Sequence, residues 1–210
     1  MTEWKVEEGL APYAETIAAM EARAAAVGEG RADELIWLVE HPPTYTAGTS
    51  AAAGELLGRA GIPVVPTGRG GRYTYHGPGQ RVVYPIIDLT RRGRDVRAYV
   101  HALEQWIIAA LDVLGVPAFR TGDTGVWTDT PGGPAKIAAI GVRVRRWVAF
   151  HGFAVNVAPD LEDYAGIIPC GIADRGVISL AALGNTAVMA DLDAALAATR
   201  AALVPPAHAA

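Results

Sequence analysis

The sequence predicts a single mixed α/β domain in which helices flank a largely antiparallel sheet. Helix-period and strand-period segments follow one another without the regular βαβ order of a doubly wound fold. The chain has 210 residues, of which 51% are hydrophobic, and this suffices for one substantial core. No internal repeat or linker divides it. We therefore expect one domain over residues 1–204 and a disordered tail over residues 205–210, where only proline and small or polar residues remain.

Three segments carry apolar residues at helical spacing. The first covers residues 12–27 and ends at the Gly28-Glu29-Gly30 stop. The longest covers residues 95–114, has a broad apolar face and ends at Gly115. The third covers residues 190–203. Each is expected to pack its apolar face on the sheet.

Strands are expected in three further segments. Residues 34–40 form a short apolar run with β-branched and aromatic members, which is typical of a buried strand. Residues 81–89 predict another strand, although Pro85 favours an edge or bulged position because proline has no N–H for a neighbouring strand. Residues 137–157 alternate in polarity for a stretch and predict two adjacent strands joined by a tight reversal.

Charge and terminal composition exclude several classes of protein. A formal net charge of −4 argues against nucleic-acid binding, which normally requires a basic excess or stripe. The first residues lack the basic start and apolar run of a signal peptide, and no apolar stretch approaches the roughly 20 residues of a membrane span. We therefore expect a soluble, cytoplasmic and monomeric protein.

Cys170 is the only cysteine, and it stands between Pro169 and Gly171. A lone cysteine forms no internal disulfide and leaves no cysteine-rich metal site, so it is either buried filler or a reactive nucleophile. Free cysteine is among the most buried residue types, and composition alone therefore favours filler.

Lys136 is distinguished by the bias against lysine in this chain. The basic residues are 16 arginines and only two lysines, and Lys136 lies in an otherwise uncharged run. Lysine can lose its proton when desolvated, whereas arginine stays protonated, so an internal lysine kept against this bias indicates proton chemistry. The alternative is a lysine that reaches from a strand end to solvent. The other lysine, Lys5, lies near a terminus that we expect to be loose.

Residues 67–80 contain five glycines, two arginines and a histidine. Glycines let backbone N–H groups approach a ligand closely, and adjacent N–H groups can form a nest for an anion. Arg69 and His76 are candidates for orienting a carboxyl-derived or phosphate group. The segment is therefore interpreted as a binding loop, and the alternative is a long surface turn.

Three motifs together identify a family resemblance. They are RGGRYTYHGPGQ at residues 69–80, KIAAIGV at 136–142 continuing to HGFAVN at 151–156, and PCGI at 169–172. In this order they closely resemble the lipoyl(octanoyl) transferases of lipoate biosynthesis, and HPPTYT at residues 41–46 also fits. The resemblance covers about residues 35–185.

The resemblance implies a fold like that of the biotin and lipoate protein ligases, with residues 1–204 as the catalytic domain. It implies transfer of an octanoyl or lipoyl group from acyl carrier protein to a lysine of lipoyl domains, such as those of 2-oxoacid dehydrogenases or the glycine cleavage H protein. The implied catalytic pair is Cys170 and Lys136, with neither metal nor cofactor. The substrate-binding residues that it implies are Arg69, Gly70, Gly71, Arg72, Tyr73, Thr74, Tyr75, His76, Ala139, Ile140, Gly141, Gly152, Phe153 and Ala154.

The chemistry of the pair agrees with this interpretation. A thioester donor is already activated, so attack by the Cys170 thiolate exchanges one thioester for another without ATP. A protonated Lys136 would favour the thiolate, and a neutral Lys136 could act as a base; the sequence leaves both states open. For His76 and His151 we expect positioning of backbone or of a substrate carbonyl in preference to proton transfer.

Two basic clusters, at residues 91–97 and 143–146, could steer acidic carrier proteins or could simply be solvated faces. Steering predicts that the KM for acyl carrier protein rises with ionic strength. Two other functions stay open: an ATP-dependent lipoate or biotin ligase, and a noncatalytic module that binds acyl carrier or lipoyl domains.

Overall fold

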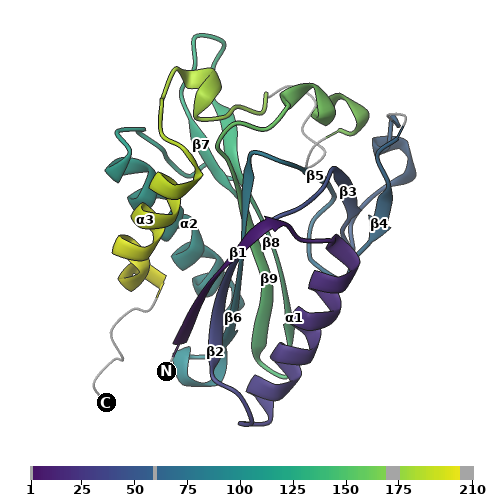
Figure 1. Cartoon of the computed structure of the whole chain (residues 1–210), viewed down its shortest axis with the longest axis vertical. Coiled ribbons are helices and arrows are strands. Elements are labelled where there is room, and N and C mark those ends of the chain that lie inside the picture. Colours follow the sequence, from purple (N-terminus) through teal and green to yellow (C-terminus); the bar gives the residue numbers. More distant parts are fainter. Residues whose placement is uncertain (1, 59–60, 169–175, 204–210) are drawn as a thin grey trace.

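Two sheets and three α-helices make up the part of the chain that this computed structural model describes, residues 2–58, 61–168 and 176–203 (Figure 1). The large sheet has the spatial order β1 (Thr2–Leu10), β2 (Glu34–Glu40), β6 (Gln80–Asp88), β9 (Val148–Asn156), β8 (Ala135–Arg145) and β7 (Val126–Thr128). Its strands pair antiparallel except for the parallel pair of β1 and β2. The expected mixed, largely antiparallel sheet is therefore confirmed.

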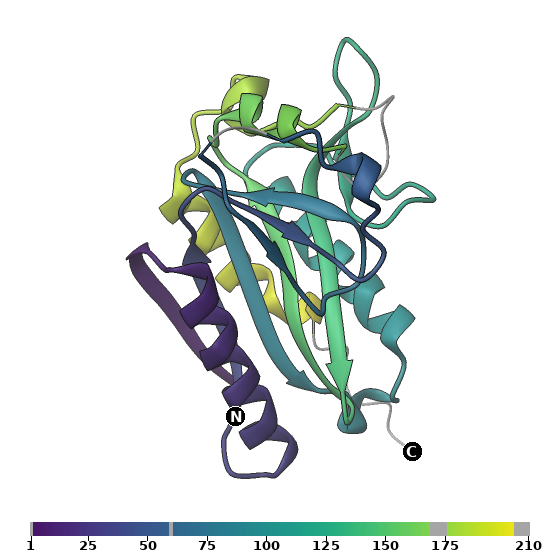
Figure 2. The ribbon, with the colours of Figure 1, turned by 90° about the vertical axis from the view of Figure 1, so that its right-hand side faces the viewer.

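The helices cover both faces of this sheet. Helix α1 (Tyr13–Gly28) lies on one face, and α2 (Val96–Val113) and α3 (Met189–Thr199) lie on the other (Figures 1 and 2). All three were expected from their periodicity; the end of the third continues as a 3-10 turn, Arg200–Leu203. The expected disordered tail at 205–210 lies outside the described residues.

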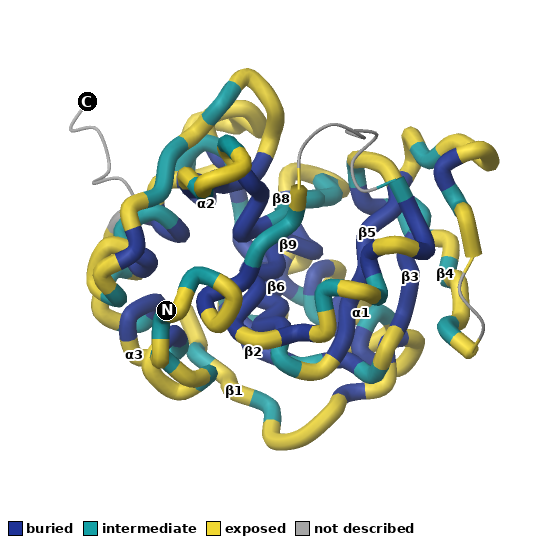
Figure 3. Tube along the Cα trace, turned by 90° about the horizontal axis from the view of Figure 1, so that it is seen from above, coloured by how far each residue is buried: buried dark blue, intermediate teal, exposed yellow. Residues whose placement is uncertain are grey.

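Because both faces are covered, the central strands are buried along most of their length (Figure 3). On one side α2 packs Leu103, Trp106 and Ile107 into the core, and all three are fully buried. On the other side α1 contributes Met20 and Ala24. Because β2 is buried on both faces, its sequence is an unbroken apolar run and does not alternate between apolar and polar residues.

Pro85 was expected at an edge or bulged position, and the structure contradicts the first of these alternatives. Its strand, β6, lies in the interior of the sheet between β2 and β9, so the expected edge position is incorrect. The pairs of β6 with β9 stop at Val83–Phe153 and resume at Ile87–Ala149 in the same register. Facing this interval, His151 turns to φ 58° and its N–H lies 3.2 Å from the Met20 sulfur. The sheet thus tolerates the missing N–H of proline through a local distortion of the neighbouring strand.

The amino-terminal segment is ordered, contrary to the expectation of a loose terminus. Strand β1 pairs in parallel with β2, and Lys5 lies 2.6 Å from the Glu7 carboxylate and 4.7 Å from the centre of the Trp37 ring. Most of β1 is exposed and rich in charge, because it forms the edge of the sheet. An exposed edge strand lacks the apolar signal on which a sequence-based prediction depends.

A second sheet lies beside the amino-terminal end of α1 (Figure 2). Its order is β4 (Val64–Pro66), β3 (Thr44–Ala47) and β5 (Tyr73–His76), with β3 parallel to β4 and antiparallel to β5. The glycine-rich segment expected to be a loop therefore contains β5 and the first residue of β6. None of the helices in the described residues is long and apolar enough to cross a membrane.

Candidate functional site

A cavity of about 490 Å³ lies between the glycine-rich segment and the strands β8 and β9. Its floor consists of small residues that pair across the two strands: Ala139 with Ala154, and Gly141 with Gly152. Its roof is the segment 69–76. The missing side-chain bulk on the floor leaves room for an apolar ligand.

All but two of the expected substrate-binding residues line this cavity. Gly70 does not, but its N–H donates to the Val142 carbonyl over 2.9 Å and so attaches the roof to β8. Tyr75 points to the opposite side of β5, where its hydroxyl lies 2.6 Å from Asp163 Oδ2. The cavity is lined by the twelve others, Arg69, Gly71, Arg72, Tyr73, Thr74, His76, Ala139, Ile140, Gly141, Gly152, Phe153 and Ala154.

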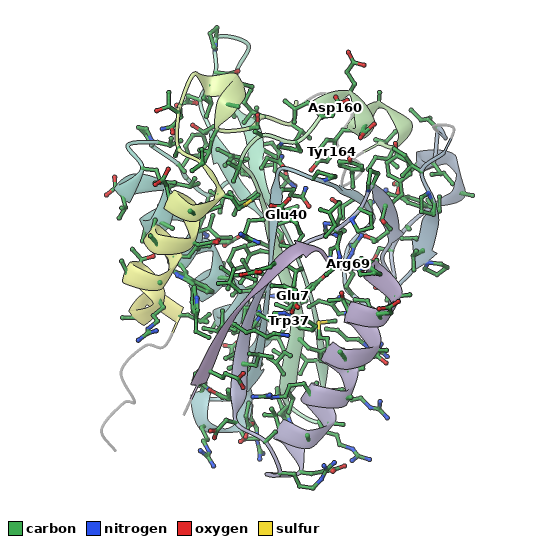
Figure 4. The ribbon with its side chains drawn as sticks, viewed as in Figure 1. Glu7, Trp37, Glu40, Arg69, Asp160 and Tyr164 are labelled. Carbon is green, nitrogen blue, oxygen red and sulfur yellow. The ribbon has the colours of Figure 1, made fainter. Side chains whose placement is uncertain are left out.

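Arg69 shapes the roof of the cavity (Figure 4). Its buried guanidinium donates to Thr46 Oγ1 at 2.7 Å, to the Thr46 carbonyl at 2.8 Å and to the carbonyls of Gly70 and Arg72 at 3.0 and 2.9 Å. These acceptors belong to the protein itself. Arg69 therefore holds the roof segment against β3, and its role in orienting a ligand stays a prediction.

The cavity is also lined by side chains that were not among the expected binding residues: Tyr13, Val82, Tyr84 and His151. Tyr13 comes from the start of α1, and it was assigned only to the apolar face of that helix. The sequence offers no signal that a residue so distant in the chain reaches the cavity. His151 was expected to position backbone or a substrate carbonyl, but it was not among the expected binding residues.

Hydrogen bonds and burial define the protonation of three histidines at and beside the cavity: His41, His76 and His151. His41 Nδ1 donates to the Ala11 carbonyl over 2.7 Å, so its Nε2 accepts from the Tyr84 hydroxyl at 2.8 Å. Burial lowers the pKa of His41 to about 4 and the pKa values of His76 and His151 to about 3. All three rings are therefore neutral near pH 7.

The tautomer of His76 follows from Gln80. The Gln80 amide nitrogen donates to the Tyr75 carbonyl, so the Gln80 amide oxygen must be the atom that accepts from His76 Nδ1 at 2.7 Å. His76 Nε2 then carries a lone pair. The ring also stacks on Tyr13, with 5.9 Å between the ring centres.

Lys136 lies on β8 in a smaller, adjoining cavity of about 240 Å³ that shares Thr74 and Ala139 with the larger one. The side chain is buried, with 7% of the residue exposed. Its Nζ donates to the Thr124 carbonyl over 3.1 Å and lies 4.8 Å from the centre of the Trp127 ring. The alternative of a lysine that reaches solvent is therefore incorrect.

Glu104, which the sequence analysis missed, fixes the turn that accepts from Lys136. This buried carboxylate of α2 accepts from the Gly125 N–H at 3.2 Å and from Arg120 Nε at 2.5 Å. Gly125 has φ 123°, and a Cβ there would lie 2.8 Å from the Ala138 carbonyl oxygen. The turn at Thr124 and Gly125 is thus held closely against Lys136.

Cys170 lies outside the described residues, which stop at Ile168 and resume at Gly176. The Ile168 N–H donates to the Glu55 carbonyl over 2.8 Å. On the other side, the Lys136 N–H donates to the Gly176 carbonyl over 2.9 Å, and the Lys136 carbonyl accepts from Ile178 at 3.0 Å. The segment that carries the cysteine is therefore followed directly by residues paired with the backbone of Lys136.

A buried amide network reinforces this junction. Asn156 Nδ2 donates to the Ile178 carbonyl over 3.0 Å, while its oxygen accepts from Gln80 at 3.0 Å and from Tyr164 at 3.1 Å. The network connects β6, β9 and the turn Leu161–Gly166 to the residues paired with Lys136. Among the described residues, no cluster of three or more His, Cys, Asp or Glu side chains is placed to hold a metal ion.

Comparison with known families agrees with this geometry. The family model of the lipoyl protein ligase A/B catalytic domain matches residues 12–200. The chain belongs to this family. Relatives named octanoyltransferase are 61% identical in Maricaulis maris and 62% identical in Sphingopyxis alaskensis. These matches cover 92% and 94% of this chain and 88% and 91% of the relatives.

Solved members of the ligase-like group share the fold. A putative lipoate protein ligase of Thermoplasma acidophilum with bound lipoic acid aligns with a TM-score of 0.73 at 16% identity, over 96% of this chain and 85% of the other. A bi-partite lipoate protein ligase from the same organism aligns with a TM-score of 0.71 at 17% identity, over 97% and 84%. The expected biotin/lipoate ligase-like fold is confirmed.

Proposed function

We propose that this member of the lipoyl protein ligase A/B family is an octanoyltransferase that passes an octanoyl or lipoyl group through a thioester on Cys170. The donor is octanoyl-acyl carrier protein, and the acceptor is a lysine of a lipoyl domain. The observation that carries the proposal is the buried Lys136 side chain in a small cavity, which adjoins at Thr74 and Ala139 a larger cavity with a floor of small residues. The residues that follow the cysteine segment pair with the backbone of this lysine.

The first half of the reaction exchanges two thioesters. The Cys170 thiolate attacks the carbonyl carbon of the donor, a new C–S bond forms, and the C–S bond to the carrier breaks. The carrier thiolate leaves and takes up the proton that Cys170 gave to Lys136. The Thr124 carbonyl and the Trp127 ring hold the Lys136 side chain in a fixed position during this transfer.

The second half forms the amide product. The ε-amine of the acceptor lysine attacks the octanoyl-Cys170 carbonyl, an amide bond forms, and the Cys170 thiolate leaves. Lys136, neutral after it has protonated the carrier thiolate, accepts the proton that the attacking nitrogen loses. The chemistry requires a reduced thiol, for which a cytoplasmic location is suitable.

Mass spectrometry tests the intermediate. After incubation with octanoyl-acyl carrier protein, intact mass and peptide mapping are expected to find one octanoyl adduct on Cys170, and none in Cys170→Ser. Transfer without an adduct on Cys170 would contradict the covalent route. Transfer that requires ATP and persists in Cys170→Ser would support a ligase instead.

The proton-transfer role of Lys136 is tested by its substitution, and the other lysine of the chain, Lys5, provides a matched control. Lys136→Arg keeps the charge but no longer exchanges a proton, so transfer is expected to fall by about 10² or more. Lys5→Arg, on the exposed edge strand, is expected to keep full activity. Equal activity of the two variants would exclude Lys136 as the proton carrier.

A further inference from the structure

His76 has a ring nitrogen that no residue of the described chain satisfies. The residue lines the larger cavity and is 6% exposed. Its Nδ1 is bound to Gln80, but its Nε2 has no hydrogen-bond partner among the described residues. Unlike the unpartnered Nε2 of His151, this atom keeps at least 1 Å² of accessible surface. Buried polar atoms are nearly always hydrogen-bonded, so a free and accessible nitrogen in a cavity wall indicates the place of a ligand atom.

The ring is fixed in one orientation and one tautomer. It stacks on Tyr13 and meets His41 edge-on, with 5.9 Å between the ring centres in each pair. Because Nδ1 donates to the Gln80 amide oxygen, Nε2 carries a lone pair and no proton. This nitrogen can therefore accept a hydrogen bond, but it has no proton to donate to a substrate carbonyl.

The ring lies on the side of the larger cavity that adjoins Lys136. Thr74 and His76 point to the same side of β5, because they are two residues apart on a strand, and Thr74 lines both cavities. In addition, only the amide group of Gln80 separates the His76 ring from Asn156, which also lines the Lys136 cavity. A ligand atom bound to Nε2 is therefore close to the junction at which the proposed transfer takes place.

Only a hydrogen-bond donor fits this nitrogen, and the acyl chain and its thioester carry none. The ε-amine of the acceptor lysine has N–H groups, and its lone pair must be directed at the thioester carbonyl carbon. We propose that His76 Nε2 accepts one N–H of this amine and so orients the amine for attack. This inference rests on the proposed octanoyl transfer.

His76 orients the amine without taking its proton. Burial lowers the pKa of His76 to about 3, so the ring is a weak base, and the proton that the nitrogen loses still passes to Lys136. The two residues thus divide the second half-reaction between them, one holding the nucleophile and the other accepting its proton.

Measuring the two half-reactions separately tests this role. The first is octanoylation of Cys170 by octanoyl-acyl carrier protein, followed by intact mass. The second is transfer from the isolated octanoyl-enzyme to a lipoyl domain. In His76→Leu the second is expected to slow roughly tenfold more than the first, which corresponds to the loss of one hydrogen bond. Hydroxylamine needs no oriented lysine and is expected to remove the octanoyl group from both proteins at the same rate.

Two further variants separate this role from folding. His76→Gln retains a donor for Gln80 and an amide oxygen that can accept, so it is expected to recover part of the second half-reaction. His41 is a buried histidine beside His76, but its nitrogens are both bound within the protein, to the Ala11 carbonyl and the Tyr84 hydroxyl. His41→Phe is therefore expected to affect both half-reactions to the same extent.

The outcomes distinguish this proposal from the proposed function. Equal slowing of both half-reactions in His76→Leu would overturn the orienting role, and so would slowing of the first alone, which would place the arm of the donor carrier at His76. In either case an octanoyl adduct on Cys170 of the unaltered protein would leave the octanoyltransferase proposal standing. Failure of the unaltered protein to form any adduct would overturn both.

Discussion

At the scale of single residues, the position of the Lys136 ammonium depends on a carboxylate in another element. Glu104 holds the Gly125 N–H, and the adjacent Thr124 carbonyl accepts from Lys136. Glu104→Ala is expected to lower kcat by about tenfold with little change in KM, because the turn is released while the cavity stays intact. Glu104→Gln should restore most of kcat, since its amide oxygen can accept from Gly125. If both variants give a lower yield of folded protein but keep the kcat per folded molecule, Glu104 has only a structural role.

The buried histidines give the stability of the fold a pH dependence. The folded-state pKa values of His41, His76 and His151 lie at about 4, 3 and 3, below the 6.5 of the unfolded chain. As pH falls below 6.5, the unfolded chain therefore binds protons that the folded chain does not. The free energy of unfolding should decrease by on the order of 1 kcal/mol per pH unit for each ring, until pH reaches about 4 for His41 and about 3 for His76 and His151.

Urea unfolding between pH 7 and 4.5 measures this slope. His76→Gln keeps a donor for Gln80 but removes one titrating group, so its slope is expected to be shallower than that of the unaltered protein. An identical slope would show that His76 does not contribute to the acid sensitivity.

At the scale of elements, an ion pair joins α3 to the sheet, beside the buried apolar residues of this helix. Arg81 of β6 donates to both carboxylate oxygens of Asp193, at 2.8 and 2.7 Å, and the arginine side chain is 6% exposed. Asp193→Ala leaves a buried, unpaired guanidinium and is expected to reduce the free energy of unfolding by about 3–5 kcal/mol. The double variant Arg81→Met/Asp193→Leu should lose much less in urea unfolding. Equal losses would mean that packing of α3, and not the charge pair, carries the stability.

Periodicity predicted the elements that bury an apolar face, which are the three helices and the strands β2, β6, β8 and β9. It failed for β1, which is an exposed edge, and for β3, β4, β5 and β7, which have only three or four residues each. The same limit applies to the site. The glycine-rich segment and the isolated Lys136 were recognisable locally, whereas Tyr13 and Glu104 reach the site only through the tertiary fold.

At the scale of the whole molecule, the two basic clusters meet at one end, away from Lys136. The Leu89 N–H donates to the Trp147 carbonyl over 2.8 Å, and the Arg94 guanidinium lies 5.9 Å from the centre of the Trp147 ring. This end holds the β8–β9 turn, at the bottom of Figure 1. Arg145 is nine residues from Lys136 along β8, which corresponds to about 30 Å.

That separation weakens the expectation that these arginines steer the carrier to the site. Charges are screened over about 8 Å at physiological ionic strength. The double variant Arg145→Glu/Arg146→Glu is therefore expected to change the KM for acyl carrier protein by less than about twofold at 0.15 M salt. A large rise in KM, steeper at low salt, would restore the steering role.

The cross-strand pairs on the cavity floor also restrict how this protein can diverge. A Cβ at Gly152 would lie 2.2 Å from the Val83 carbonyl oxygen, and one at Gly141 would lie 3.0 Å from that of Gly70. Backbone atoms thus fix the glycine pair, whereas Ala139 and Ala154 already carry a Cβ at the cavity floor. A lineage that adapts to shorter acyl groups can therefore be expected to accumulate its substitutions at the two alanines. Relatives that prefer acyl groups of different length would then differ mainly at this one cross-strand pair.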